Sequence, residues 1–554
     1  MSRKPFADRV RTGAGLVGTV ALLAATSMGA SWAITPPVVP PGPPPPDPAP
    51  APDWPMKQTR ACTLTGVVPG SDLRELPPAL AMLDMTAAWQ ESTGAGVVVA
   101  VIDTGVAPSP RLPHLVAGGD YVLAQYGDGL SDCDGHGTLV ASLIGAAPSG
   151  APLPVRPAGA QVAPPPPAAP APQPIPPPPP PPTITVTKTT TEPPPPPPPP
   201  PAEPPPPPGP PGPPPAWGPS GSVAQAPQRP HPQLPPPTGG PDGLVGIAPD
   251  SVILAIRQSS QNFGLKDPRI DQDQEQVRRT GDINTLARAI VHAANLGARV
   301  INISLVSCIP VTKPTDQAIL GAALRYAAVD RDAVIVAAAG NAGTQGCSQN
   351  PPPPTGASGW DEVVTIASPA WFDDYVLAVS ATDNFGTPLM GQAASLHGPW
   401  VDLAAPGSDI VGLSTSGNVI NASIDEDKFK PIIGSSFSAA YVSGVAALVR
   451  AKFPQLPAAE VIHRLTATAH APAGGRDNVI GYGVVDPLAA LTWDVPPAPA
   501  KAPTPTEAPL HVPPPPPPPD PRPARMLAAQ IGAGVVLVGA VLWGTTVWRR
   551  KHQR

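Results

Sequence analysis

Four residues in four short motifs could together perform nucleophilic chemistry on a peptide bond. Asp103 lies in the run V-A-V-I-D-T-G, and His136 lies in D-G-H-G-T. Asn341 ends the run A-A-A-G-N, and Ser436 stands in G-S-S-F-S-A-A. Serine-mediated hydrolysis requires a hydroxyl nucleophile, a histidine that takes its proton, an aspartate that orients the imidazole and a donor for the oxyanion. The pattern predicts a serine peptidase with catalytic Asp103, His136 and Ser436, and with Asn341 as oxyanion donor.

The order Asp, His, Ser along the chain distinguishes between the known families of serine hydrolases. Chymotrypsin-like enzymes have the order His, Asp, Ser, and the α/β-hydrolases have Ser, Asp, His. The motifs are similar to those of the subtilisin-like (subtilase, S8) family, over roughly residues 62–493. The serine motif differs from that family's G-T-S-x-A-x-P at Ser435, Ser438 and Ala440. Because the four reacting residues are intact, the resemblance implies an active enzyme.

The same resemblance implies where a substrate would bind. The run Asn302–Leu305 is similar to the strand on which subtilases bind the substrate as an added strand. Ser304, Leu305 and Gly340 are therefore expected to contact it. Val306 stands where many members have glycine, which is expected to narrow the substrate pocket beyond the P1 residue.

Two other mechanisms fit the residues less well. The tripeptide D-T-G at 103–105 is also the signature of aspartic proteases, but that mechanism needs a second D-[ST]-G, and the sequence has none. The nucleophile elbow G-x-S-x-G of the α/β-hydrolases is not met, because residue 438 is serine.

A parallel sheet must position these residues. From Gly96 the chain alternates strands and helices, which indicates the α/β class: a subtilisin-like parallel sheet with helices on both faces. Apolar runs without alternation predict strands at 97–102, 252–256, 300–303, 334–338 and 363–367. Helices are predicted at 136–146, at 283–296 with Asp282 as N-cap, at 315–328 and at 439–452. The reacting residues then fall at strand carboxyl ends and helix amino ends, where such sheets hold their sites.

Proline content sets the domain organisation. The chain has 96 prolines among 554 residues, standing in blocks that cannot form a packed core. The predicted segments are a signal peptide at 1–33, a proline-rich extension at 34–80, a peptidase domain at 81–495 interrupted by a proline-rich insertion at 148–243, a proline-rich linker at 496–525, a transmembrane helix at 526–548 and a tail at 549–554. The extension is expected to wrap the catalytic domain. The insertion is expected to be a polyproline II spacer, with a docking motif as the alternative.

Both chain ends predict a single-pass membrane protein with an extracytoplasmic catalytic domain. Basic residues before the apolar run 14–25 indicate a signal peptide, with a retained anchor as the alternative. The apolar run 526–547 suits a hydrocarbon core of about 30 Å, and the basic residues after it predict a cytoplasmic tail. The net charge of -6, without a basic patch interleaved with aromatic residues, argues against a nucleic-acid partner.

The four cysteines fit an oxidising compartment, where an even number predicts disulfides. Three pairings are possible. The pairs Cys62–Cys133 and Cys308–Cys347 are favoured, because Cys308 and Cys347 each follow one of two parallel strands and Cys133 lies three residues before His136. Zinc-ligand spacing is absent, so no metal or other cofactor is predicted, and calcium is left open.

Within the subtilases, the layout resembles the mycosins, the membrane-anchored serine proteases of type VII (ESX) secretion systems. The resemblance rests on the signal-like N-terminus, the cysteine positions, the insertion after the His136 motif and the proline linker into one C-terminal helix. It implies processing of exported protein or peptide substrates and association with the type VII secretion membrane complex. The alternative is a structural subunit of that complex whose peptidase activity is dispensable.

Overall fold

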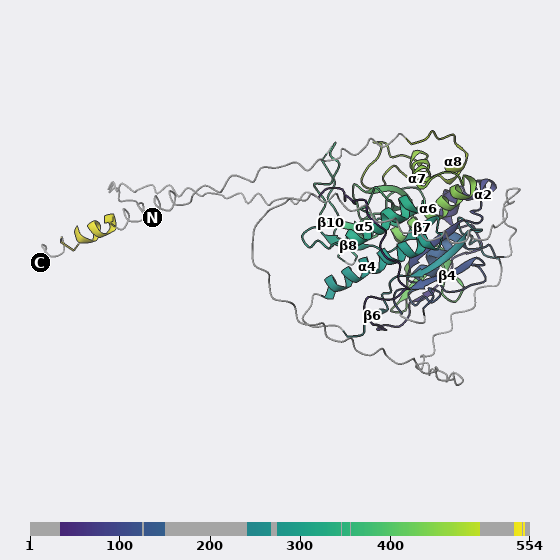
Figure 1. Ribbon diagram of the computed structural model, residues 1–554, viewed down its shortest axis with the longest axis horizontal. Coiled ribbons are helices and arrows are strands. Elements are labelled where there is room, and N and C mark those ends of the chain that lie inside the picture. The colour runs from purple at the N-terminus through teal and green to yellow at the C-terminus, as the bar shows by residue number, and fades with distance from the viewer. Residues whose placement is uncertain are drawn as a thin grey trace, which may run out of the picture. The chain divides into compact units, whose positions relative to one another are not determined.

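A seven-stranded parallel sheet with strand order β12-β11-β9-β7-β3-β5-β4 organises the fold (Figure 1). Its strands are β3 Val98–Asp103, β4 Leu115–Asp120, β5 Val252–Arg257, β7 Val300–Ile303, β9 Val334–Ala338, β11 Val376–Thr382 and β12 Val401–Pro406. The five central strands β3, β5, β7, β9 and β11 are buried at every residue. Valine, isoleucine and alanine make up most of these strands, as expected for a sheet that is covered on both faces.

Helices cover both faces of the sheet and form two cores with it. One face packs against α2 Met85–Glu91, α3 His136–Gly145, α6 Ser435–Lys452, α7 Ala458–Ala467 and α8 Pro487–Thr492, with α1 Pro78–Met82 beside them. The other face packs against α4 Gln274–Asn295, α5 Ala318–Arg325 and the π-helical turn η1 Tyr326–Asp330. A short 3-10 turn, η2 Gly391–Ala393, lies between β11 and β12. The helix α6, buried along almost its whole length, is the central helix of the first core.

Short strands form four smaller sheets around this core. The pairs and the triplet are β1 Met56–Gln58 with β6 Phe263–Leu265, β8 Ser307–Pro310 with β10 Thr365–Ser368, β13 Gly412–Leu413 with β14 Val419–Ile420, and β2 Leu64–Gly66 with β15 Ala422–Asp425 and β16 Lys428–Pro431. Every pairing in these sheets is antiparallel.

The computed structural model describes residues 34–123, 127–149, 241–267, 274–344, 346–354, 356–498, 537–545 and 547–548. The predicted signal peptide, most of the insertion and almost all of the linker lie outside the described residues. Contacts divide the chain into the units Met1–Ala498 and Pro499–Arg554. The predicted transmembrane segment 526–548 is described only in part, and that part is helical. Of the helices described, none combines the length and apolar character that a membrane crossing needs.

Four predicted elements need correction. The helix predicted over 439–452 begins four residues earlier, at Ser435, so Ser436 lies inside its first turn rather than before it. The run 363–367 is not a strand of the parallel sheet: the strand found there, β10, pairs antiparallel with β8. An apolar run indicates that a strand is buried, but it does not indicate whether the strand pairs parallel or antiparallel with its neighbour. Asp282 is not an N-cap, because α4 begins at Gln274 and the aspartate lies inside the helix. The helix predicted over 315–328 begins only at Ala318 and ends in η1.

The described part of the N-terminal extension packs on the peptidase domain. Ile34 and Val39 pack against the second core. Further along, the carboxylate of Asp47 contacts Nδ1 of His292 on α4 at 2.9 Å, and Asp53 forms an ion pair with Arg288 on the same helix. The strand β1 then pairs with β6. The extension therefore runs over α4 before it reaches the sheet's carboxyl edge.

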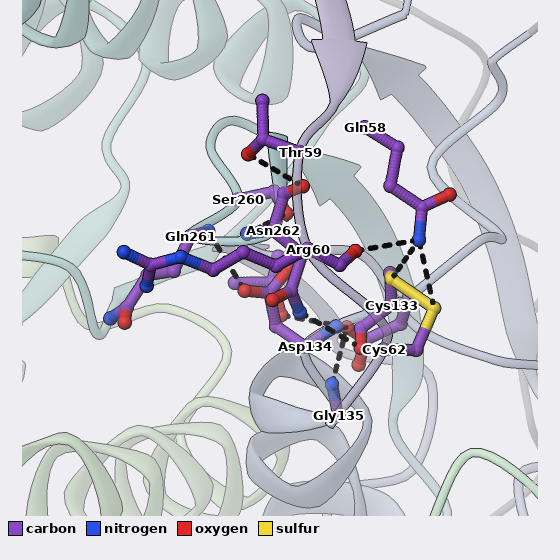
Figure 2. The surroundings of a disulfide bond; sticks show 12 residues. Gln58, Thr59, Arg60, Cys62, Cys133, Asp134, Gly135, Ser260, Gln261 and Asn262 are labelled. Atoms are coloured by element: carbon purple, nitrogen blue, oxygen red, sulfur yellow. Dashed lines mark hydrogen bonds between the residues drawn. A yellow bond between two sulfur atoms is a disulfide. The ribbon is translucent and has the colours of Figure 1, made fainter. Parts of the chain in front are cut away.

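The disulfides are Cys62–Cys133, with a Cα–Cα separation of 4.6 Å, and Cys308–Cys347, with 5.2 Å. These are the pairs that the sequence favours. Figure 2 shows the first, which joins the extension to the segment leading into α3. Hydrogen bonds reinforce it: the Thr63 N–H donates to the Cys133 carbonyl at 2.9 Å, and Asn262 Nδ2 donates to the same carbonyl at 3.2 Å.

Removing the first disulfide is expected to destabilise the protein substantially. The Cys62→Ser, Cys133→Ser double variant opens a covalent loop whose ends are 71 residues apart, which on the chain-entropy account lowers the free energy of unfolding by about 4 kcal/mol. Denaturant unfolding of the oxidised proteins measures the loss. The matched Cys308→Ser, Cys347→Ser variant, with a separation of 39 residues, is expected to lose slightly less. An unchanged unfolding midpoint in the first variant would contradict the expectation.

The two ends of the insertion meet at Arg111. Its Nε donates to the carbonyl of Ala147 at 2.5 Å, its Nη1 donates to the carboxylate of Asp242 at 2.8 and 3.1 Å, and its Nη2 donates to the carbonyl of Leu244 at 2.6 Å. The N–H of Gly243 also donates to a main-chain carbonyl of the extension. Asp242 and Gly243, at the end of the predicted insertion, thus contact the folded domain.

Replacing residues 150–240 with a short Gly-Ser linker is expected to leave folding and peptide hydrolysis nearly unchanged. The contacts of Arg111 already hold both attachment points together, and closure entropy depends only weakly on loop length. Melting temperature and turnover of the shortened protein, against the full chain, check this. A drop of many degrees would show that the removed segment contributes to the fold.

Candidate active site

The four predicted reacting residues come together at the carboxyl edge of the sheet. Asp103 is the last residue of β3, and His136 is the first residue of α3. Asn341 follows the end of β9 by three residues, and Ser436 lies in the first turn of α6. Because β3, β7 and β9 are neighbours and parallel, their carboxyl ends lie side by side.

The imidazole of His136 is held by Asp103. Its Nδ1 lies 2.7 Å from Oδ1 of Asp103, and the Thr104 N–H donates to the same oxygen at 2.7 Å. The Asp103 side chain is fully buried, whereas 29% of the His136 side chain is exposed. The ring of Phe437 packs 5.3 Å from the imidazole, centroid to centroid. The Nδ1 edge of the imidazole is therefore fixed by Asp103, and the rest of the ring remains partly exposed to solvent.

Burial lowers the pKa of His136, but the charge of Asp103 and its hydrogen bond outweigh that effect, so the pKa is raised above the ordinary 6.5. The nearby carboxylates of Asp132 and Asp134 act in the same direction. The protein therefore favours the imidazolium, which is the form that a proton-accepting histidine passes through.

Asp132 is a residue of this site that sequence reasoning missed. Its carboxylate accepts hydrogen bonds from the hydroxyls of Thr104 and Thr138 and from the N–H groups of Asp134, Gly135 and Thr138. It thereby ties the residue after Asp103 to the first turn of α3. The signal was available in the sequence, since Asp132 stands four residues before His136 in a run where aspartate is a common cap.

The Ser436 hydroxyl donates to the main-chain carbonyl of Ser304 at 2.9 Å. A hydroxyl carries one proton, so in this rotamer it does not donate to His136. The Ser304 hydroxyl in turn contacts the Ser436 carbonyl at 3.3 Å and accepts from Asn302 Nδ2 at 2.7 Å. As the second residue of α6, Ser436 has a main-chain N–H without a partner in its own helix.

Ser435 fixes the side chain of Asn341. Its Oδ1 accepts from the N–H and the hydroxyl of Ser435, at 3.0 and 3.1 Å. Those two contacts fix the amide plane and leave Nδ2 directed away from Ser435. A side chain at Gly434 would approach Nδ2 to 3.2 Å, so only glycine leaves room beside it.

The predicted substrate-contact residues lie on two neighbouring segments. Ser304 and Leu305 follow β7, and Gly340 follows β9. The Gly340 N–H donates to the Ser435 hydroxyl at 3.2 Å, and its carbonyl accepts from Leu396 at 2.9 Å. Within the described part of the chain, no group of three or more His, Cys, Asp or Glu side chains is placed to hold a metal ion.

The sheet order and the Asp–His pair at its carboxyl edge define a subtilisin-like peptidase, and comparisons with known proteins agree. A model of the Subtilase family matches residues 223–483, a range that holds Asn341 and Ser436. Mycosin-5 of Mycobacterium tuberculosis (strain ATCC 25618 / H37Rv) is 48% identical over 573 residues, covering 98% of this chain and 97% of the relative. Mycosin-2 of the same strain is 52% identical over 478 residues, covering 84% and 85%.

Solved structures give the same result. The crystal structure of MycP1 from Mycobacterium smegmatis is 40% identical, with a TM-score of 0.66, covering 86% of this chain and 99% of that one. A chain in the periplasmic assembly of the ESX-5 inner membrane complex is 46% identical, also with a TM-score of 0.66, covering 87% and 100%. The chain therefore belongs to the mycosins, which are serine endopeptidases of the subtilase family.

Proposed function

We propose that Asp103, His136 and Ser436 form the catalytic triad of this endopeptidase and that Asn341 completes its oxyanion hole. The observation that carries the proposal is the 2.7 Å contact between His136 Nδ1 and the buried carboxylate of Asp103. With Nδ1 engaged, Nε2 is the nitrogen left to accept a proton. For the reaction, the Ser436 hydroxyl must leave the Ser304 carbonyl and donate its proton to that nitrogen.

The reaction follows from this arrangement. Ser436 Oγ attacks the scissile carbonyl while His136 takes the hydroxyl proton, and Asp103 stabilises the imidazolium. The new oxyanion accepts hydrogen bonds from Asn341 Nδ2 and the Ser436 N–H at the positive end of α6. His136 then protonates the leaving amine, and water hydrolyses the acyl-enzyme in the same way. None of these steps calls on a cofactor, and no calcium site is assigned.

The substrate would bind as an extended strand between the segments that follow β7 and β9. Displacing the Ser436 hydroxyl from the Ser304 carbonyl frees that carbonyl to accept a substrate N–H. Leu305 and Gly340 then flank the substrate on its two sides. Main-chain pairing of this kind binds peptides largely independently of sequence.

Labelling with a fluorophosphonate probe tests the proposal directly. Wild-type protein is expected to react at Ser436, and Ser436→Ala protein is expected to remain unlabelled. Peptide mapping of the labelled protein identifies the modified residue. Labelling at another serine, or equal labelling of both proteins, would refute the assignment.

Activity is expected to fall on the acid side with a midpoint above pH 6.5. The base form of His136 is needed, and the Asp103 charge raises the pKa of His136 above that value. Protonation removes the base as the pH drops through the raised pKa. A profile of kcat/KM from pH 5 to pH 9 measures the midpoint. A midpoint below 6.5 would show that burial, rather than Asp103, dominates.

A second candidate function is a structural role in a type VII secretion membrane complex. It is favoured by the homologous chains in structures of the ESX-5 inner membrane complex and its periplasmic assembly. The two roles are compatible. Complementation separates them: a strain lacking the protein is rescued by Ser436→Ala if the scaffold role is the essential one, and is not rescued if processing of exported substrates is essential.

We further propose that the catalytic domain lies outside the cytoplasmic membrane, anchored by the segment 526–548. The periplasmic location of the homologous chains supports this, as do the two disulfides. Protease treatment of intact spheroplasts is expected to digest the catalytic domain and spare a tag placed after Arg554. Protection of the catalytic domain would reverse the topology.

A further inference from the structure

The carboxylate of Asp132 accepts hydrogen bonds at both of its oxygens. Oδ1 accepts from the Thr104 hydroxyl at 2.9 Å and from the N–H groups of Asp134 and Gly135 at 3.1 and 2.8 Å. Oδ2 accepts from the hydroxyl and the N–H of Thr138 at 2.7 and 2.9 Å. Loss of hydration raises the pKa of Asp132 to about 6, so at neutral pH the group is mostly the carboxylate, which only accepts hydrogen bonds.

Two threonine hydroxyls extend this carboxylate into a link between β3 and α3. The Thr104 hydroxyl, which donates to Asp132, accepts from the Gly137 N–H at 2.9 Å. The Thr138 hydroxyl, which also donates to Asp132, accepts from the Ala107 N–H at 2.9 Å. Each hydroxyl therefore joins the chain that follows β3 to the first turn of α3. Asp132 orients both hydroxyls, because each has a single proton to donate.

The contact between Asp103 and His136 lies beside this link. Asp103 immediately precedes Thr104, and His136 immediately precedes Gly137. A methyl group built on Gly137 would overlap the carbonyl oxygen of Gly105, so the first turn of α3 packs directly on the chain that follows β3. The 2.7 Å contact between His136 Nδ1 and Asp103 Oδ1 depends on the same close approach.

We propose that Asp132 is a positioning residue that holds His136 against Asp103 by linking the end of β3 to the first turn of α3. The inference rests on the proposed function, in which the Asp103–His136 pair activates Ser436. Asp132 acts through the main chain rather than on the reacting atoms. Its loss would displace the imidazole, and a displacement of about 1 Å can lower a rate by about 10²-fold.

Asp132→Asn is expected to lower kcat by about 10- to 100-fold with little change in KM. The amide has the shape of the carboxylate, but its nitrogen cannot accept a hydrogen bond from Thr104 or Thr138. Because the charge of Asp132 also raises the pKa of His136, kcat is taken on the alkaline plateau of each pH profile. The remaining loss then reports geometry rather than the protonation of the base.

Asp134→Asn is the matched control, because it removes an equal charge two residues along the same segment. The Asp134 carboxylate accepts from the Ser260 hydroxyl and the Gln261 N–H, which follow β5 (Figure 2). It also raises the pKa of His136, so both variants are expected to move the acid limb of the profile to lower pH. Plateau kcat of Asp134→Asn is expected to stay within a few-fold of wild type.

A double-mutant cycle with Asp103 separates positioning from a general structural defect. If Asp132 acts through the Asp103–His136 pair, Asp132→Asn is expected to cost less than about threefold in an Asp103→Asn background, because the pair is already lost. A structural role independent of the pair would cost the same factor in both backgrounds. A fluorogenic peptide makes the residual turnover of the Asp103→Asn proteins measurable.

Variants of Thr104 decide the question if melting curves show that Asp132→Asn is unfolded. Thr104→Val removes the hydroxyl and is expected to lower kcat, whereas Thr104→Ser keeps the hydroxyl and is expected to restore most of the rate. The proposal is overturned by wild-type kcat in folded Asp132→Asn or Thr104→Val, by equal losses in Asp132→Asn and Asp134→Asn, or by an undiminished loss in the Asp103→Asn background. In each case fluorophosphonate labelling of Ser436 would still stand. Failure of that labelling overturns the proposed function and this inference with it.

Discussion

Ser436→Ala protein is expected to hydrolyse peptides about 10⁶-fold more slowly than wild type in kcat. Without the Oγ nucleophile, His136 and Asp103 have no group to activate, and only substrate binding and the oxyanion donors remain. Binding should change little, because the Ser304 carbonyl and the Gly340 segment are unaltered. Steady-state kinetics on one peptide, with active-site titration of the wild type, gives the ratio.

The neighbouring serine supplies the matched control. Ser438 lies two residues along the same helix, is buried, and donates to the carbonyl of Pro406 at 3.1 Å. Ser438→Ala removes the same atom from the same helix and restores the residue usual in the family pattern. Its kcat is expected to stay within a few-fold of wild type. Equal loss in both variants would mean that the Ser436 effect is a folding effect.

Asn341→Asp is expected to reduce kcat by about 10²- to 10³-fold with little change in KM. An aspartate has the same shape, and its Oδ1 can still accept the N–H and hydroxyl of Ser435. The substitution replaces Nδ2, a hydrogen-bond donor, with Oδ2, a negatively charged oxygen that would face the oxyanion. The substitution thus removes transition-state stabilisation while keeping the local structure.

Asn341→Ala is the comparison variant for this result. It removes the donor and also the contacts to Ser435, so it should lose a similar factor in kcat and, in addition, some thermal stability. The melting temperature of Asn341→Asp should exceed that of Asn341→Ala. Wild-type kcat in folded Asn341→Asp would exclude the amide from the oxyanion hole.

The sequence predicts the central strands β3, β5, β7 and β9, but it predicts neither β11 nor the edge strands β4 and β12. The strand β3 is apolar up to Ile102 and β9 is apolar throughout, so composition alone indicates that both faces of these strands are buried. The strand β11 contains Ser380 and Thr382, which are buried, and β12 contains Asp402, whose carboxylate accepts the Ala378 N–H at 3.0 Å. In the sequence alone, polar residues suggest a loop. Their hydrogen-bond partners inside the protein become known only from the structure.

The identities of the reacting residues could be predicted because their motifs combine specific residue types in a specific order. Their contacts depend on tertiary structure. No sequence pattern states that Ser436 donates to Ser304, which lies 132 residues away. The position of Asp132 before His136 suggests a capping residue, but its link between Thr104 and Thr138 exists only because β3 approaches α3 in the fold.

The insertion divides the active site between two stretches of chain. Asp103 and His136 precede it, whereas Asn341 and Ser436 follow it. In the sheet, β3 from the first stretch lies between β5 and β7 from the second. Each disulfide joins cysteines within one stretch, so neither spans the insertion.

A single proteolytic cut within 150–240 would therefore produce a two-chain enzyme. Its fragments would separate on a denaturing gel even without reductant. In native buffer they would remain one particle, because an interior strand and the contacts of Arg111 with Asp242 and Leu244 hold them together. Fragment complementation, with the two halves expressed separately, becomes a practical way to assemble an active protein from an Asp–His half and an Asn–Ser half.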